Sequence, residues 1–138
     1  MAAARSTLRR TPLPAKTSMT IQTQDDVTAL QRIGHIVSEV LQRMLDAAQP
    51  GMTTLELDRL GARWLEERGA RSAPQLTYGF PGATCISINE QAAHGVPGDR
   101  VIRAGDVLNV DVSAELDGYF ADTGDRKSTR LNSSHEWI

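Results

Sequence analysis

Residues 109–124 read NVDVSAELDGYFADTG, and this stretch decides the fold of the chain. In its first half, small and apolar residues alternate with polar ones, which is the period-2 pattern of a strand with one buried face. The pair Asp117-Gly118 favours a two-residue type I′ turn, because both central positions of that turn need a positive φ. The stretch therefore predicts a β-hairpin whose return strand begins at Tyr119.

The register of this hairpin brings two aspartates together. With a two-residue loop, Ser113 pairs with Asp122, and Asp111 becomes the diagonal neighbour of Asp122 on the same face. Converging carboxylates repel each other unless a cation lies between them, and hard oxygen ligands suit Mn, Mg, Fe(II), Zn or Co. Spacing alone leaves two interpretations open: a divalent-metal site, or two solvated aspartates on the wet face of an edge hairpin.

Two amphipathic helices are predicted ahead of the hairpin. Thr23 and Asp26 have the spacing of a capping box, and apolar residues recur at helical spacing over residues 27–45. Thr53 and Glu56 have the spacing of a second capping box, which is followed by another apolar face. Faces of this kind are more typical of core packing than of ligand binding, so we expect both helices to build the core.

The composition excludes several classes of function. The chain has 138 residues, and its 15 Lys and Arg against 17 Asp and Glu leave a formal net charge of -2, so we expect neither nucleic acid nor an anionic membrane as a partner. The single cysteine, Cys85, cannot form an internal disulfide or a CxxC metal site, which favours a reducing compartment such as the cytoplasm. No apolar run reaches transmembrane length. We expect one α+β domain at most.

The two ends of the chain differ from its middle. Residues 1–20 are basic and lack acidic residues, and we expect a disordered N-terminal extension there, with a transit segment or a true start at Met19 as alternatives. Residues 125–138 begin with DRKSTRLNSSH, which resembles the one-frame translation of a common sequencing-library adaptor. We therefore expect 125–138 to be a non-native tail, with a genuine polar C-terminus as the alternative, and we assign His135 no metal role.

Several motifs follow one another between these ends. They are, in order, the segment QPGMTTLELDRL and then GFP, CISINE, HGVP, GDVLNVDV and DGYFADT. As an ordered set they resemble the type I methionine aminopeptidases, which belong to the pita-bread family of metallopeptidases. The resemblance covers residues 21–124 and implies the N-terminal lobe of the catalytic domain. The fold it implies is the N-terminal half of a pita-bread, with two helices followed by antiparallel strands and a hairpin.

The resemblance also implies roles for five residues. Asp111 and Asp122 match the two hairpin aspartates of a family site that holds two divalent metal ions, for which Co, Mn, Fe, Zn and Ni are candidates. His94 matches the histidine of the HGVP loop, which binds the scissile amide of the substrate and assists proton movement in catalysis. Phe80 and Cys85 fall where the family lines its methionine side-chain pocket, with Cys85 as a wall and not a nucleophile.

The activity implied by the resemblance is removal of the initiator methionine from nascent polypeptides when the second residue is small. The implied partners are polypeptide N-termini that begin with Met, with the ribosome as a further candidate, and the complete enzyme is expected to be a monomer. The family site takes five protein ligands, and its other histidine and two glutamates lie in the second half of the fold. We therefore expect the chain to be truncated and inactive on its own.

Two other functions stay open. The chain could be a non-catalytic peptide-binding module on the pita-bread fold, or part of a proline-dipeptidase-like enzyme. The HGVP and CISINE motifs favour the aminopeptidase.

Overall fold

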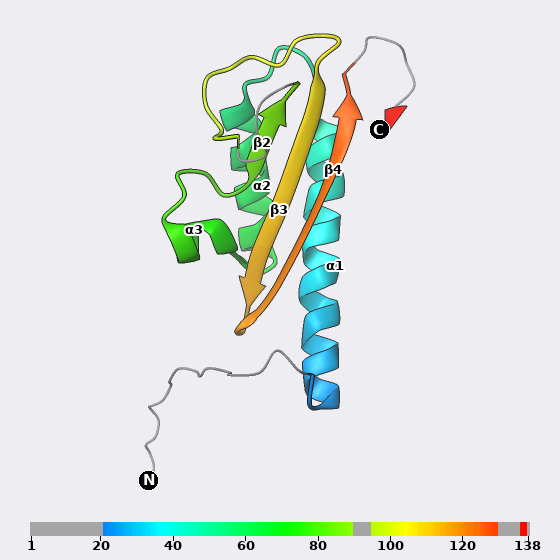
Figure 1. Cartoon of the computed structure of the whole chain (residues 1–138), viewed down its shortest axis with the longest axis vertical. Coiled ribbons are helices and arrows are strands. Elements are labelled where there is room, and N and C mark those ends of the chain that lie inside the picture. The colour runs from blue at the N-terminus through cyan, green and yellow to red at the C-terminus, as the bar shows by residue number, and fades with distance from the viewer. Residues whose placement is uncertain (1–20, 90–94, 130–135, 138) are drawn as a thin grey trace.

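The computed structural model describes residues 21–89, 95–129 and 136–137 (Figure 1). The helices are α1 (Gln24–Ala47), α2 (Thr54–Glu67) and α3 (Ala73–Tyr78), and the strands are β1 (Arg71–Ser72), β2 (Cys85–Ile88), β3 (Val107–Leu116), β4 (Tyr119–Ser128) and β5 (Glu136–Trp137). This mixture of helices and an antiparallel sheet confirms the predicted α+β class. The extension predicted for residues 1–20 lies outside the described residues, as does His135.

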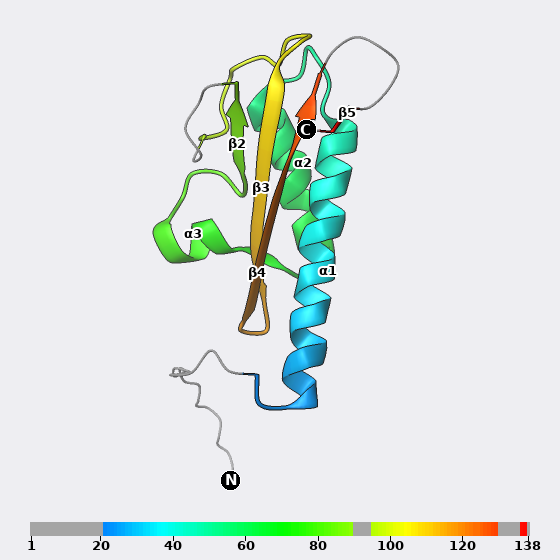
Figure 2. The ribbon, with the colours of Figure 1, turned by 45° about the vertical axis from the view of Figure 1, so that its right-hand side comes forward.

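The sheet is antiparallel and is built around β3. One side of β3 pairs with β1 and β2 at different points along its length, and the other side pairs with β4, which in turn pairs with β5. Helices α1 and α2 cover one face of this sheet (Figures 1 and 2). None of the described helices combines the length and the apolar character needed to cross a membrane.

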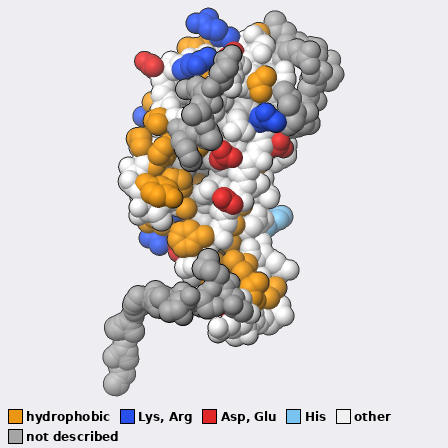
Figure 3. Space-filling model, in the orientation of Figure 1, with side chains coloured by type: hydrophobic (Ala, Val, Ile, Leu, Met, Phe, Trp, Pro, Cys, Tyr) orange, Lys and Arg blue, Asp and Glu red, His pale blue; other side chains and the backbone are white. Residues whose placement is uncertain are grey.

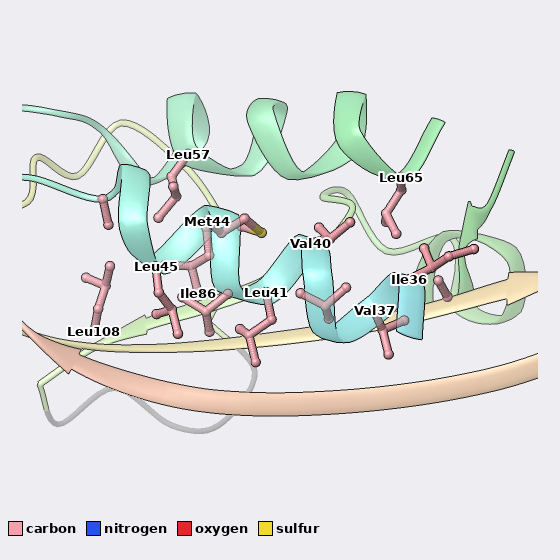
Figure 4. Close-up of a cluster of buried hydrophobic side chains, with 14 of the residues drawn as sticks. Ile36, Val37, Val40, Leu41, Met44, Leu45, Leu57, Leu65, Ile86 and Leu108 are labelled. Carbon is pink, nitrogen blue, oxygen red and sulfur yellow. The ribbon is translucent and has the colours of Figure 1, made fainter. Parts of the chain in front are cut away.

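The core fills the space between the two long helices and the sheet (Figure 4). Its side chains come from both layers, and among the fully buried ones are Ile36, Val40, Met44, Leu57, Leu65, Ile86 and Leu108. Gly61 lets α2 approach α1 closely, because a Cβ there would lie 2.5 Å from the Met44 sulfur. The apolar faces of the helices therefore build the core, as the sequence predicts.

Both predicted helix starts are confirmed. Thr23 and Asp26 form the capping box of α1, and Thr53 and Glu56 form that of α2. The Tyr119 hydroxyl also donates a hydrogen bond to Asp26 at 2.5 Å, which ties the return strand of the hairpin to the start of α1. This hydrogen bond is the main cause that lowers the pKa of Asp26 and raises the pKa of Tyr119.

The β3–β4 hairpin has the predicted register. Ser113 lies opposite Asp122, and Asp111 lies opposite Gly124. The two loop residues have φ values of 55° and 88°, which is the double positive φ of a type I′ turn. Buried side chains on β3 alternate with half-buried ones, so the odd-numbered residues from Asn109 to Ser113 face away from the helices.

Strand β4 continues to Ser128, although the strand pattern in the sequence ends at Gly124. The first residues of β3 provide backbone partners for this continuation. Lys127 turns toward the helices, where its Nζ donates hydrogen bonds to the carbonyl oxygens of Leu45 at 2.6 Å and Ala48 at 3.1 Å. Backbone pairing with β3 therefore extends β4 beyond Gly124. The alternation of polar and apolar side chains in the sequence does not reveal such pairing. The non-native origin expected for 125–138 stays a prediction.

Candidate functional site

A cavity of about 690 Å³ opens on the face of the sheet that the two long helices leave free. The lining residues come from α3, β2, β3, β4 and the segment after α3, and they are Pro74, Tyr78, Phe80, Cys85, Asp111, Ser113, Asp122, Thr123 and Gly124. Figure 3 views this face, where acidic side chains lie beside a group of hydrophobic ones. The structure thus brings together four of the five residues singled out in the sequence, Phe80, Cys85, Asp111 and Asp122.

The short helix α3 forms one side of the cavity and is not predicted from the sequence. It begins with Ser72 as its N-cap and with Pro74 in its first turn, and it ends at Gly79, which has a φ of 66°. Tyr78, on its last turn, is 83% exposed, and Phe80 follows just after the helix. A serine cap with a proline two residues later is a helix-start signal, so the sequence did carry a sign of α3.

Asp111 and Asp122 lie on neighbouring strands on the face away from α1 and α2. Asp111 is half-buried and Asp122 is exposed. The Asp111 carboxylate lies over β4, because a Cβ on residue 124 would overlap its Oδ1 atom. Gly124 therefore leaves room for the Asp111 carboxylate on the strand that also carries Asp122, and its role appears only once the register is known.

The donors on this face suit a divalent cation. Two carboxylates stand beside the hydroxyl-bearing residue Ser113, which lies opposite Asp122, and none of the nine lining residues is a lysine or an arginine. Oxygen donors of this kind are preferred by hard divalent ions. Over the described ranges, no group of three or more His, Cys, Asp or Glu side chains comes together to hold a metal ion. The described part of the chain therefore brings two carboxylates together here, which is fewer than a complete coordination shell needs.

Cys85 lies opposite Asp111 in the ladder between β2 and β3. Its side chain is half-buried, and burial raises the pKa of the thiol, with smaller contributions from the negative charges of Asp111 and Asp58. A thiol that stays protonated near neutral pH is a poor nucleophile. The position and chemistry of Cys85 suit a polarizable wall of the cavity.

His94 lies outside the described residues, but the residue that follows it can be placed. The Gly95 amide donates a hydrogen bond to Ser87 Oγ at 3.2 Å, and the Gly95 carbonyl accepts one from the Ile86 amide at 3.1 Å. A Cβ on Gly95 would overlap the carbonyl oxygen of Ile86. Gly95 is therefore attached to β2 next to Cys85, and glycine permits the close approach.

Comparison with known proteins identifies relatives over the same part of the chain. Residues 28–125 match the profile of Metallopeptidase family M24. The chain is 52% identical over 106 residues to a methionine aminopeptidase of Staphylococcus epidermidis, and 44% identical over 107 residues to methionine aminopeptidase 2 of Bacillus subtilis. Each alignment covers 77% of this chain, but only 42% of the first relative and 43% of the second. The chain thus spans less than half the length of these relatives.

Solved structures of related enzymes have the same fold. A methionine aminopeptidase from Rickettsia prowazekii superposes with a TM-score of 0.75 at 32% identity, covering 82% of this chain and 46% of that one. A methionine aminopeptidase from Thermotoga maritima has a TM-score of 0.76 at 24% identity, and the match covers 84% of this chain and 47% of that one. A prolidase from Pyrococcus furiosus has a TM-score of 0.69 at 17% identity, and the match covers 83% of this chain and 32% of that one. These structural similarities confirm the prediction that the chain has the fold of the N-terminal half of a pita-bread. The family match over residues 28–125 and the shared fold place the chain in metallopeptidase family M24.

Proposed function

We propose that this chain supplies one half of the active site of a methionine aminopeptidase, which removes the initiator methionine from nascent polypeptides with a small second residue. The observation that carries the proposal is the cavity that unites Asp111 and Asp122 with Phe80 and Cys85. The sequence identity to methionine aminopeptidases and the match to Metallopeptidase family M24 both support it.

Asp111 and Asp122 would hold the metal in this function. We propose two divalent ions, drawn from Co, Mn, Fe, Zn and Ni, as the resemblance to the methionine aminopeptidases implies, and the two carboxylates on one face of the hairpin support this. When bound, such ions supply an activated water and polarise the carbonyl of the peptide bond. The two aspartates would provide the fixed negative charge that holds the ions at the cavity.

Phe80 and Cys85 would receive the methionine side chain. An aromatic ring and a neutral thiol form a polarizable surface, which suits a thioether. The raised pKa of Cys85 supports this role because it keeps charge away from the apolar part of the ligand. The polypeptide N-terminus would then lie toward the two aspartates, which line the same cavity.

His94 would bind the scissile amide and carry a proton during the reaction. Gly95, the residue after it, is bonded to Ile86 and Ser87, which follow Cys85 in β2. This attachment supports a role for His94 at the same cavity. Imidazole is suited to proton transfer near neutral pH.

The partners proposed for the complete enzyme are nascent polypeptides in the cytoplasm, and the ribosome at which they emerge. For the 138-residue chain alone we expect weak metal binding and no aminopeptidase activity, because two carboxylates do not close a coordination shell. Metal-dependent release of methionine from a Met-Ala-Ser peptide by the purified chain would contradict this expectation.

A calorimetric titration with Mn(II) tests the metal site. We expect weak binding to the unmodified chain and none to Asp111→Asn or Asp122→Asn. Asp99→Asn is the matched control, because Asp99 is an exposed aspartate outside the cavity lining. The proposal fails if the two cavity variants bind Mn(II) as well as the control does.

A further inference from the structure

A buried carboxylate on α2 holds the segment that leads into β2. Asp58 is only 4% exposed, and it accepts hydrogen bonds from the Ala83 amide at 3.0 Å, the Thr84 amide at 2.8 Å and the Thr84 hydroxyl at 2.5 Å. A buried carboxylate is costly unless hydrogen bonds replace its hydration. Asp58 therefore contributes stability only while Ala83 and Thr84 stay in this position.

A second buried side chain holds the same segment. The Ser72 hydroxyl donates a hydrogen bond to the Ala83 carbonyl at 2.8 Å. Gly82 is closely surrounded, because a Cβ there would lie 2.9 Å from ring carbons of Pro97 and 3.3 Å from Asp58 Oδ2. The segment 82–84 is thus fixed from two elements that lie apart in the sequence.

The fixed segment joins two parts of the cavity wall. Phe80 lies shortly before it, and Cys85 follows it directly. Cys85 then enters β2 opposite Asp111. Asp58 itself does not line the cavity, so any effect on a ligand must pass through the position of this wall.

We infer that Asp58 is a positioning residue that sets, through segment 82–84, how far Phe80 lies from Cys85 and the two aspartates, and thereby the size of the side chain that the cavity accepts. The size selection rests on the proposed function, in which the ligand is the first residue of a peptide. Loss of Asp58 frees two backbone amides and one hydroxyl in a buried place, so the wall moves to satisfy them. The widened cavity then discriminates less against bulky side chains.

The width can be measured at Cys85, because it is the single cysteine of the chain. The folded protein is treated with N-methylmaleimide and, separately, with the bulky N-(1-pyrenyl)maleimide. The same Cys85 thiolate attacks both reagents, so the ratio of their rates is insensitive to the thiol pKa. In Asp58→Ala we expect the rate of the bulky reagent to rise relative to that of the small one, since the wall beside Cys85 loses the partner that holds it.

Two further variants complete this measurement. Asp58→Asn keeps one acceptor oxygen and should give an intermediate ratio, whereas Glu67→Gln, on the exposed side of the same helix, should leave the ratio unchanged. If Asp58→Ala does not fold by circular dichroism, Asp58→Asn carries the test. A lower melting temperature with an unchanged ratio in the folded Asp58 variants overturns the inference.

A protection experiment separates this inference from the proposed function. Methioninamide should slow the modification of Cys85 in the unmodified chain more than tryptophanamide does, and Asp58→Asn should reduce that difference. Absence of protection by either amide overturns the proposed peptide site and the size selection together. The reagent ratio still decides whether Asp58 sets the cavity width.

Discussion

At the scale of single residues, the bond between Tyr119 and Asp26 links stability to pH. The pKa of Asp26 is lowered from 3.8 mainly by the Tyr119 hydroxyl, so its contribution is present above pH 3.8 and is lost as the pH falls through the folded-state pKa. The pKa of Tyr119 is raised from 10.0, so its contribution is present below pH 10.0 and is lost as the pH rises through the folded-state value.

Replacing Tyr119 by Phe removes this hydrogen bond. We expect Tyr119→Phe to lower the free energy of unfolding at pH 7, and the difference from the unmodified chain to shrink as Asp26 is protonated at low pH. Urea denaturation between pH 2.5 and pH 7 measures both effects. Tyr78→Phe is the control, since Tyr78 is 83% exposed. A pH-independent difference would show that the hydroxyl acts without Asp26.

The thiol of Cys85 allows a second test among single residues. Its pKa is raised from 9.0 by burial first and by Asp111 second, so the alkylation rate should reach half its maximum above pH 9.0. Asp111→Asn should move this midpoint down but not below 9.0, because burial remains. A midpoint that does not respond to Asp111→Asn would place that carboxylate away from the thiol.

At the scale of elements, the two long helices meet at a glycine. Gly61→Ala should lower the free energy of unfolding by about 1–3 kcal/mol, because the new methyl group lies 2.5 Å from the Met44 sulfur and the packing must shift. Gly34→Ala on α1 is the matched control, since its Cβ meets nothing within 4 Å, and it should stabilise the helix by about 0.5–1 kcal/mol. Equal responses to the two substitutions, measured by chemical denaturation, would contradict this packing.

The helices and strands also differ in how well the sequence predicts them. Capping boxes and the Asp117-Gly118 turn are local signals, so the starts of α1 and α2, the hairpin and its register are predicted correctly. Strand β1 and the end of β4 depend on pairing with distant residues of β3, and no local pattern reports that. In the site, register alone brings Asp111 and Asp122 together. The role of Asp58 depends on contacts with residues 25 and 26 positions away, which the sequence does not reveal.

At the scale of the whole molecule, α1 and α2 cover one face of the sheet (Figure 1), and the described residues leave the other face and the outer edge of β4 largely open. The outer edge of β4 pairs with β5 only at Lys127 and Ser128 within the described residues, and Phe120 on that strand is 50% exposed. Open strand edges beside apolar side chains favour association between chains. The molecule therefore presents a surface on which further copies can pair.

We expect the purified chain to self-associate as its concentration rises, and Phe120→Lys to reduce this association. Sedimentation velocity measures the effect. Ile21→Lys is the control, because Ile21 is exposed to a similar extent, 51%, and lies outside the sheet. A monodisperse monomer that melts cooperatively at all concentrations would contradict the expectation.

The central claim is that Asp111 and Asp122 share one metal site at the cavity. Paramagnetic broadening of amide NMR signals by Mn(II) tests it most directly, because the broadening falls steeply with distance from the bound ion. We predict that the signals of Asp111, Asp122, Gly124 and Cys85 are lost first, and that Asp122→Asn abolishes this pattern. Broadening that begins elsewhere on the chain, or that persists unchanged in Asp122→Asn, would contradict the claim.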